Sequence, residues 1–422
     1  MTSLYTKPHL SFNKLILSDF YRLFPGILSE LLGGFILSTL LVKYLSPESM
    51  GIYTLLWIAQ TQISALSTGW LLNSIIRFLP ENPYYLRYFI NISLSTIILL
   101  GFMCLVIIPI TLILLRDYFQ FNYLFWTALL LCLSSLYQLF QGILRGLFNQ
   151  VIYSTNAFFL ISIKLILLVI LFQFFNNRLK ITFIILALSH LPLIIWQYYN
   201  LIKLSYYNNI NNISITKRTL INKSFNYGIP LSLSYFIILF LQSGDRYILS
   251  ALLSLKDIGI YSFWMSIGLQ ISRSLYGFIF MIINPRLFQI YHTKPSKTNS
   301  YVRFMSLIYI FILGPFLLLI SFCLPYFYEY IKADIQYTSH SHLLLFSIGM
   351  GFFSGLAQLL GKRFEFEKDT LIFVFASLVG VIVMVFGIFF LVPSFGLNGA
   401  GVSSLMGFVI YFLIIFFTSI IK

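Results

Sequence analysis

Long apolar segments alternate with short polar turns along the whole chain. A helix that crosses a bilayer needs about 20 mostly apolar residues, and twelve segments of this kind can be placed. We therefore predict an all-α integral membrane protein with six spans in each half. The predicted spans are 24–45, 51–76, 89–115, 121–144, 152–176 and 181–202 in the first half, and 226–254, 259–285, 304–328, 340–361, 370–393 and 396–421 in the second.

The composition is typical of a chain whose solvent is mostly lipid. Hydrophobic residues make up 59% of the chain and charged residues 9%, whereas a soluble domain carries about 25% charged residues. No polar segment is long enough to form a soluble domain outside the membrane. The segment 1–19 is polar and lacks a short apolar stretch before a small-residue cleavage site, so we expect no removable signal peptide.

Basic residues are distributed unevenly between the two sets of loops. Eighteen Lys and Arg residues fall on the side that carries both termini, and six fall on the other side. Because cytoplasmic loops are enriched in Lys and Arg, we expect both termini in the cytoplasm. The formal net charge of +15 then indicates loops that face anionic lipid headgroups. It does not indicate a nucleic-acid partner, because no aromatic–basic module of the usual kinds is present.

The two halves share an internal repeat at an offset of 208 residues. Gly-Ile-Tyr at 51–53 recurs at 259–261, and Gln-Ile-Ser at 62–64 recurs at 270–272. Between 51 and 79, nine of 29 positions are identical, where chance would give about two or three. Six spans per repeat is an even number, so both halves have the same orientation. We expect an axis along the membrane normal to relate them, as in transporters built from two bundles.

A polar stretch at 205–222, rich in Asn, Tyr and Lys, divides the chain nearly in half. Each half begins with a helix that carries a proline near its start, Pro25 or Pro230. The predicted organisation is therefore an N-terminal six-helix bundle at 1–204, a cytoplasmic linker at 205–223 and a C-terminal six-helix bundle at 224–422.

Four segments carry a resemblance to a known family. They are Tyr-Leu-Ser-Pro-Glu-Ser-Met-Gly-Ile-Tyr at 44–53, Ile-Leu-Arg-Gly at 143–146, Asp-Arg-Tyr-Ile-Leu-Ser at 245–250 and Leu-Val-Pro-Ser-Phe-Gly-Leu-Asn-Gly-Ala at 391–400. In their order and spacing, over nearly the whole chain, they resemble the O-antigen and polysaccharide lipid flippases of the multidrug/oligosaccharidyl-lipid/polysaccharide exporter superfamily. The segment 360–365 departs from that pattern, because it is more highly charged than expected.

The resemblance implies a V-shaped fold of two six-helix bundles around a central cavity, in a bacterial cytoplasmic membrane. It also implies alternating access to a polyprenyl-diphosphate-linked oligosaccharide, the repeat unit of a surface polysaccharide, with no covalent chemistry. The expected partners of this monomeric transporter are the lipid-linked oligosaccharide, membrane lipids and the polysaccharide polymerase machinery. No cofactor is expected apart from Na+ or H+ as a coupling ion.

Charged residues inside predicted spans are the first candidates for function. A charge at the bilayer centre costs about 2.5–3.5 kcal/mol, so most of them should face a water-filled cavity or a partner. Glu30 is a candidate for proton or sodium coupling, or a structural partner of Lys164 or Arg273. Asp245 and Arg246 would point about 100 degrees apart on a continuous helix. This adjacent pair suits either a coupling or charge-partner role, or packing and capping near the outer end of the seventh span.

Arg273 is the strongest candidate for contact with cargo. Ser266, Gln270, Arg273 and Gly277 are spaced four, three and four residues apart, so they share one face of the eighth span. The repeat partner of Arg273 is Ala65, and a charge present in only one half favours a function at this position. We therefore predict that Gln270 and Arg273 line the cavity. The alternative is an arginine bonded to a helix-end carbonyl.

Three further basic residues are predicted to line the cavity. Lys164 lies in the middle of its span, where its depth favours the lumen or an acidic partner. Arg145 shares a polar stripe of the fourth span with Ser134, Gln138, Gln141 and Asn149. Arg145 and Arg77 both lie near cytoplasmic span ends, where an anchor that reaches the interface is the alternative.

Two other functions stay open. A drug or organic-cation exporter of the same superfamily would need an acidic, aromatic lumen, whereas the charges inside predicted spans are three basic and two acidic. A polysaccharide polymerase or ligase would need a reactive site, usually with a long outer loop, and we find neither. His340 and His342 share a loop with Asp334, but no third ligand joins them at metal spacing. We therefore predict no catalytic residue and no metal site.

Overall fold

The structure is a computed structural model that describes residues 12–80, 82–114, 121–147, 149–207, 217–293, 295–330, 335–366, 369 and 371–421. Every regular element within these residues is a helix. Eight of the described helices are long and apolar enough to cross a membrane, and one of these, Leu371–Ile420, covers the last two predicted spans. The prediction of an all-α membrane protein is therefore confirmed.

The N-terminal half contains the first six predicted spans. Four of them are single helices, whereas the second breaks at Thr68 into α2 and α3, and the sixth breaks at 189–190 into α7 and α8. A short 3-10 turn at Pro83–Tyr85 precedes α4. The helices are α1 (Phe12–Tyr44), α2 (Pro47–Ser67), α3 (Gly69–Phe78), α4 (Leu86–Leu114), α5 (Phe121–Gly146), α6 (Gln150–Phe174), α7 (Arg178–Leu188) and α8 (Leu191–Tyr207).

The C-terminal half contains the other six predicted spans. The seventh breaks at Gly244 into α9 and α10, and the ninth passes through a π-helical turn at Tyr309–Leu313. The helices are α9 (Lys217–Ser243), α10 (Asp245–Ser250), α11 (Leu255–Thr293), α12 (Pro295–Ile308), α13 (Gly314–Tyr330), α14 (Ile335–Thr338), α15 (Leu343–Leu360), α16 (Lys362–Phe366) and α17 (Leu371–Ile421).

Local signals set where individual helices start and bend. The Ser46 side chain accepts a hydrogen bond from the Ser49 amide, and Pro47 occupies the first helical position. This cap starts α2 at residue 47 rather than at the predicted 51. Near the other end of the chain, Gly396 has φ 54 and ψ −132, outside the helical region. Because glycine tolerates positive φ, α17 bends there, between the last two predicted spans.

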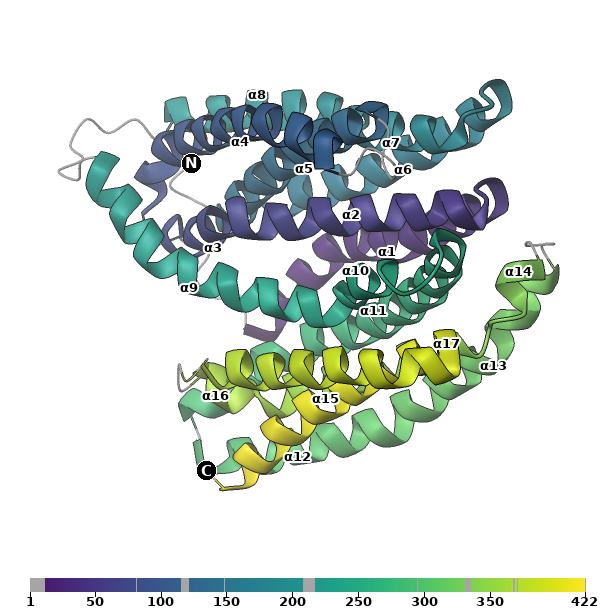
Figure 1. Cartoon of the computed structure of the whole chain (residues 1–422). Helices are drawn as coiled ribbons and strands as arrows, with labels where there is room; N and C mark the ends of the chain where they lie inside the picture. The colour runs from purple at the N-terminus through teal and green to yellow at the C-terminus, as the bar shows by residue number, and fades with distance from the viewer. Residues whose placement is uncertain are drawn as a thin grey trace.

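The helices form three layers in the view of Figure 1, and both halves contribute to the middle layer. Helices α4 to α8, from the N-terminal half, occupy the top of the view, and α12, α13 and α15 to α17 occupy the bottom. Between them run α1, α2 and α3 together with α9, α10 and α11. The most extensive contacts between the halves are those of α2 with α11 and of α3 with α9.

The contact of α3 with α9 is close and partly polar. Trp70 stacks on Phe225 with ring centroids 4.1 Å apart, and the Ser74 hydroxyl donates to the Ser224 carbonyl over 2.9 Å. A β-carbon on Gly228 would overlap the carbonyl of Trp70, so only glycine allows the two helices to approach this closely. The first helix of the C-terminal half therefore packs directly on the N-terminal half.

The contact of α2 with α11 follows the internal repeat. A β-carbon on Gly51 would overlap the Leu255 carbonyl oxygen, and a β-carbon on Gly259 would overlap the Pro47 carbonyl oxygen. The offset of 208 residues relates Gly51 to Gly259 and also Pro47 to Leu255. The same contact is thus made twice, in reciprocal form, near the ends of α2 and α11 that follow the α1–α2 and α10–α11 turns.

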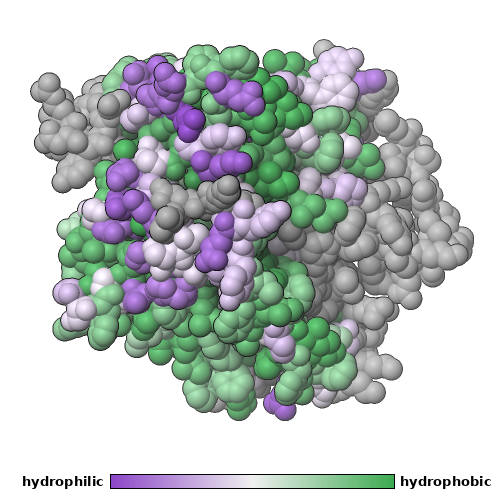
Figure 2. Space-filling model, turned by 90° about the vertical axis from the view of Figure 1, so that its right-hand side faces the viewer, coloured by the Kyte–Doolittle hydropathy of each residue, from purple (hydrophilic) through white to green (hydrophobic). Residues whose placement is uncertain are grey.

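Large apolar side chains cover much of the periphery. Phe102 and Leu105 on α4 are 64% and 65% exposed, and Phe311 in the ninth span is 72% exposed. Exposure of this kind suits a lipid-facing surface. Figure 2 looks onto the end at the right of Figure 1. Hydrophilic side chains gather toward the upper left and middle of this face, and hydrophobic ones occupy most of its lower margin.

Candidate functional site

The candidate site is built around the break between α9 and α10. The Gly244 amide donates to the Phe240 carbonyl over 2.6 Å, and the chain then starts α10 at Asp245. A β-carbon on Gly244 would lie 2.7 Å from both the Phe240 ring and its carbonyl oxygen. Contacts this short are not tolerated, so glycine is needed at the break.

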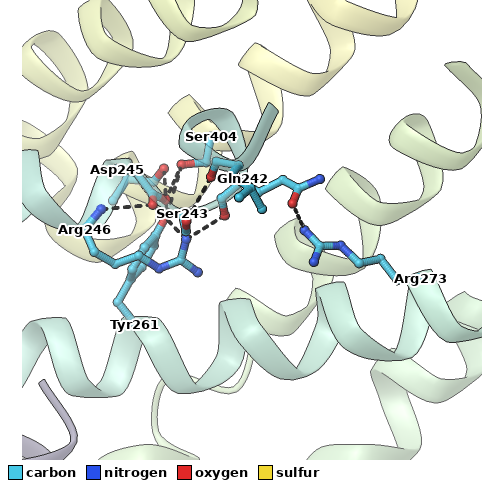
Figure 3. Close-up of polar contacts among 9 residues, drawn as sticks. Gln242, Ser243, Asp245, Arg246, Tyr261, Arg273 and Ser404 are labelled. Carbon is cyan, nitrogen blue, oxygen red and sulfur yellow. Dashed lines mark hydrogen bonds and ion pairs between the residues drawn. The ribbon is translucent and has the colours of Figure 1, made fainter. Parts of the chain in front are cut away.

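Asp245 and Arg246 form a buried ion pair with each other (Figure 3). Arg246 Nη1 lies 2.8 Å from Asp245 Oδ1, and the two side chains are 1% and 0% exposed. The same Oδ1 accepts the Arg246 amide over 2.9 Å. Adjacent residues of a helix point about 100 degrees apart, but these two side chains still meet, because the Asp245 carboxylate folds back onto the start of α10.

The second oxygen of Asp245 connects three helices. Asp245 Oδ2 accepts a hydrogen bond from the Tyr261 hydroxyl over 2.6 Å and from the Ser404 hydroxyl over 2.8 Å. Tyr261 lies on α11 and Ser404 lies on α17, and both are buried. These two hydroxyl donors satisfy an acceptor that is buried away from solvent. Asp245 thus ties α10 to α11 and α17.

Arg246 is satisfied mainly by groups on its own segment. Besides Asp245, its Nη1 donates to the Gln242 carbonyl over 2.7 Å. Its guanidinium lies 5.5 Å from the Tyr261 ring centroid. Arg246 Nε is buried and has no hydrogen-bond partner among the described residues. The pair therefore fits a structural centre of the C-terminal half, and neither member is free to take a charged cargo.

Arg273 lies one helix away and has a different environment. It is half-buried on α11, and its Nη2 donates to the side-chain oxygen Oε1 of Gln242 (Figure 3). Among the described residues, no carboxylate forms an ion pair with it. The predicted alternative of a carbonyl-bonded arginine is replaced by a bond to a side-chain amide.

The predicted stripe around Arg273 is the open face of α11. From Ile258 to Leu269 every residue is buried except Ser266, which is exposed. Gln270 and Arg273 are half-buried, and a β-carbon on Gly277 would meet no atom within 4 Å. The stripe therefore marks the side of α11 that its neighbours leave uncovered.

A small cavity of about 60 Å³ adjoins this stripe, between helices of the two halves. Gln270 and Ser274 of α11 line it together with Leu32 and Phe35 of α1. A β-carbon on Gly34 would overlap the Gln270 amide group, so Gln270 packs against the α1 backbone. Gln270 thus lies where α11 of the C-terminal half meets α1 of the N-terminal half.

The other predicted basic residues lie away from this stripe. Lys164 is half-buried on α6 in the N-terminal half, where its charge acts on the ring of His190. Arg145 and Arg77 are exposed at the ends of α5 and α3. For Glu30, the side chain lies outside the described part of the chain, so its predicted role is not addressed.

Two members of the polar stripe that includes Arg145 are buried within the N-terminal half. Ser134 is buried and accepts from Gln60 Nε2 over 2.6 Å, and Gln141 is buried and donates to the Tyr137 hydroxyl over 2.6 Å. These contacts lie inside the N-terminal half, where Gln141 Oε1 has no hydrogen-bond partner among the described residues. A stripe of polar residues can thus seal helices together as well as face water.

Three residues of the site were not singled out from the sequence: Gln242, Tyr261 and Ser404. Gln242 stands four residues before Arg246, the spacing that lets a main-chain carbonyl meet a side chain one turn on. Tyr261 belongs to the Gly-Ile-Tyr repeat, so its motif was noticed but its contact with Asp245 was not.

Comparison with solved structures supports the fold. The chain is similar to a mutant of the Vibrio cholerae MATE transporter VcmN, with a TM-score of 0.63 and 12% identity over 96% of this chain and 95% of that one. It is also similar to a MOP superfamily transporter from Pyrococcus furiosus, with a TM-score of 0.57 and 14% identity over 96% and 95% of the two chains. The fold is therefore the one seen in these transporters.

Comparison with sequences identifies the family. No curated protein sequence matches the chain. Residues 20–291, well over half of the chain, match the profile of the family described as "Polysaccharide biosynthesis protein". The chain therefore belongs to this polysaccharide biosynthesis family, whose members it was already seen to resemble in the segments 44–53 and 245–250.

Proposed function

We propose that the chain is a flippase that moves a polyprenyl-diphosphate-linked oligosaccharide across the bacterial cytoplasmic membrane by alternating access. The observation that carries the proposal is the environment of the Arg273 side chain. It is a cation at membrane depth, on the uncovered face of α11, and its acceptor among the described residues is a neutral amide. A diphosphate can accept paired hydrogen bonds from a guanidinium.

The chemistry of such a cargo fits this arrangement. The diphosphate and sugars are polar and need a lined path between the halves, whereas the prenyl chain can stay in lipid. Arg273, with Gln270 beside it, offers hydrogen-bond donors to the headgroup near the contact of α1 with α11. Movement of the halves about their contact would then expose the headgroup to either side, without a covalent step.

Export of an organic cation is less well supported. A cation site needs an accessible acidic group, and Asp245 is 0% exposed and already holds Arg246, Tyr261 and Ser404. The Glu30 carboxylate, which would be the other acid at membrane depth, stays a predicted site for coupling to Na+ or H+. The sugar carried and the contact with polymerase machinery stay predictions that rest on the family resemblance.

Replacement of Arg273 tests the proposal directly. We expect Arg273→Ala to lower surface polysaccharide about tenfold or more, because a charge-assisted bond of about 1.5–3 kcal/mol is lost. Arg273→Lys should retain part of the activity, since lysine keeps the charge but not the paired bonds. The measurement is polysaccharide made by the source strain when each variant replaces the chromosomal copy.

The control is Arg303→Ala, which removes an exposed arginine from α12 of the same half. It should leave polysaccharide unchanged at matched protein levels. Near-normal polysaccharide from Arg273→Ala would contradict the proposed role, and equal loss from Arg303→Ala would show that any change of charge is harmful.

The proposed orientation predicts opposite labelling of two exposed turns. Asn82, before α4, is expected on the cytoplasmic side, and Asn176, before α7, on the outer side; both are exposed. In a protein whose three cysteines are replaced by serine, Asn176→Cys should react with an impermeant thiol reagent on intact cells. Asn82→Cys should react only after lysis, and the reverse pattern would invert the topology.

A further inference from the structure

Two guanidinium groups meet at one glutamine. Gln242 lies in the last turn of α9 and is 8% exposed. Its main-chain carbonyl accepts from Arg246 Nη1 over 2.7 Å, and its side-chain Oε1 accepts from Arg273 Nη2. Figure 3 shows Gln242 between the two arginines, with its side chain extended toward Arg273.

The two arginines differ in how their charge is balanced. Arg246 is paired with Asp245 at 2.8 Å in a fully buried site. Arg273 is held by the amide oxygen of Gln242, which carries no net charge. Gln242 therefore fixes the direction of Arg273 without cancelling its charge. A carboxylate at position 242 would fix the direction equally well and cancel the charge.

We propose that Gln242 is a positioning residue that selects for an anionic headgroup. It holds the Arg273 guanidinium at the uncovered face of α11 and gives it up when a diphosphate binds. A guanidinium bonds more strongly to an anion than to a neutral acceptor, so a diphosphate displaces the amide oxygen. This inference rests on the proposed function, because it assigns a partner to the same arginine.

The proposal is tested by two substitutions whose order it fixes. Gln242→Glu has the same shape but turns the contact into an ion pair, so the diphosphate must compete with a carboxylate. Gln242→Leu removes the side-chain amide that accepts from Arg273, so the guanidinium loses this acceptor and meets no carboxylate at position 242. We expect the apparent Kd to rise about tenfold or more for Gln242→Glu and only a few-fold for Gln242→Leu.

The measurement uses purified full-length protein and undecaprenyl diphosphate as the probe, with binding read from the rise in unfolding temperature. If Gln242 has only a packing and hydrogen-bonding role, the isosteric Gln242→Glu should be the milder change. An order of affinity in which Gln242→Leu is weakest therefore overturns the proposal. Gln138→Glu, on an exposed position of α5, adds the same charge elsewhere and should bind like the parent.

Further variants keep the result clear. Gln242→Glu combined with Arg273→Gln should bind no worse than Arg273→Gln alone, because the carboxylate acts only through Arg273. If Gln242→Glu does not fold, Gln242→Leu decides alone: affinity as low as that of Arg273→Ala contradicts the proposal. A parent protein that the probe does not stabilise overturns the proposed function itself, whereas a stabilised parent with an unaffected Gln242→Glu overturns only this inference.

Discussion

Asp245→Ala should destabilise the protein more than any other single change to the site. Without the carboxylate, Arg246 is a cation that is 1% exposed and has no anionic partner among the described residues. Removing one partner of a buried ion pair costs about 3–5 kcal/mol. The Tyr261 and Ser404 hydroxyls also lose their shared acceptor, which loosens α11 and α17 from α10.

The measurement is thermal unfolding of detergent-purified protein, together with the amount that reaches the membrane. Asp257→Ala is the matched control, because the bonds that Asp257 makes among the described side chains are local ones with Ser254, at the start of α11. It should lower the unfolding temperature by a small fraction of the Asp245→Ala effect. Replacing both partners, as Asp245→Asn with Arg246→Gln, should recover part of the loss. No recovery would mean that the pair is not the source of the effect.

Gly259→Ala should abolish most transport although it adds a single methyl group. That group would overlap the Pro47 carbonyl oxygen and lie 2.9 Å from the Gly51 amide nitrogen. Both are backbone atoms, so no side chain can rotate away. Overpacking costs about 1–3 kcal/mol, enough to shift a balance between two conformations about tenfold or more. The contact of α2 with α11 at Gly51 and Gly259, here called the seam, should then stay open.

Gly277→Ala provides a control of identical chemistry on the same helix, where the new methyl group meets no atom within 4 Å. It should transport normally. Opening of the seam can be followed with Ser266→Cys, two turns beyond Gly259 on the exposed face of α11. An impermeant reagent added outside should label this cysteine in the Gly259→Ala background and not in the parent. Equal labelling, or equal transport by both alanine variants, would contradict a seam of this kind.

Much of the fold could be predicted from hydrophobic patterning. Span length is set by the bilayer, so apolar runs identified the helices well, and the internal repeat pointed to the contact that Gly51 and Gly259 make. The positions where helices start and break were predicted less accurately. The cap at Ser46 moved one start by four residues, and the break at Gly244 falls inside the predicted span 226–254, at a polar stretch in its second half.

The site could be predicted only in part, because burial depends on the neighbouring helices. The stripe of Ser266, Gln270 and Arg273 lies on a partly exposed face of α11, although Gln270 also packs against α1 and Arg273 bonds Gln242. In the similar stripe of Ser134 and Gln141, both residues are buried, and Gln60 of α2 and Tyr137 of α5 bond to them. Periodicity identifies a polar face but not what covers it.

The packing of α9 on α3 bears on how the protein is made. Its binding surface, including Trp70 and Ser74, is encoded before α9. During synthesis α9 can therefore leave the translocation channel and dock onto helices already in the membrane, before α11 and α17 exist. The other end of α9, at Gln242, can make its contact with Arg273 only after α11 has been synthesised, and α9 meets α17 later still. The packing of α9 therefore begins early in assembly and is completed by one of the last helices.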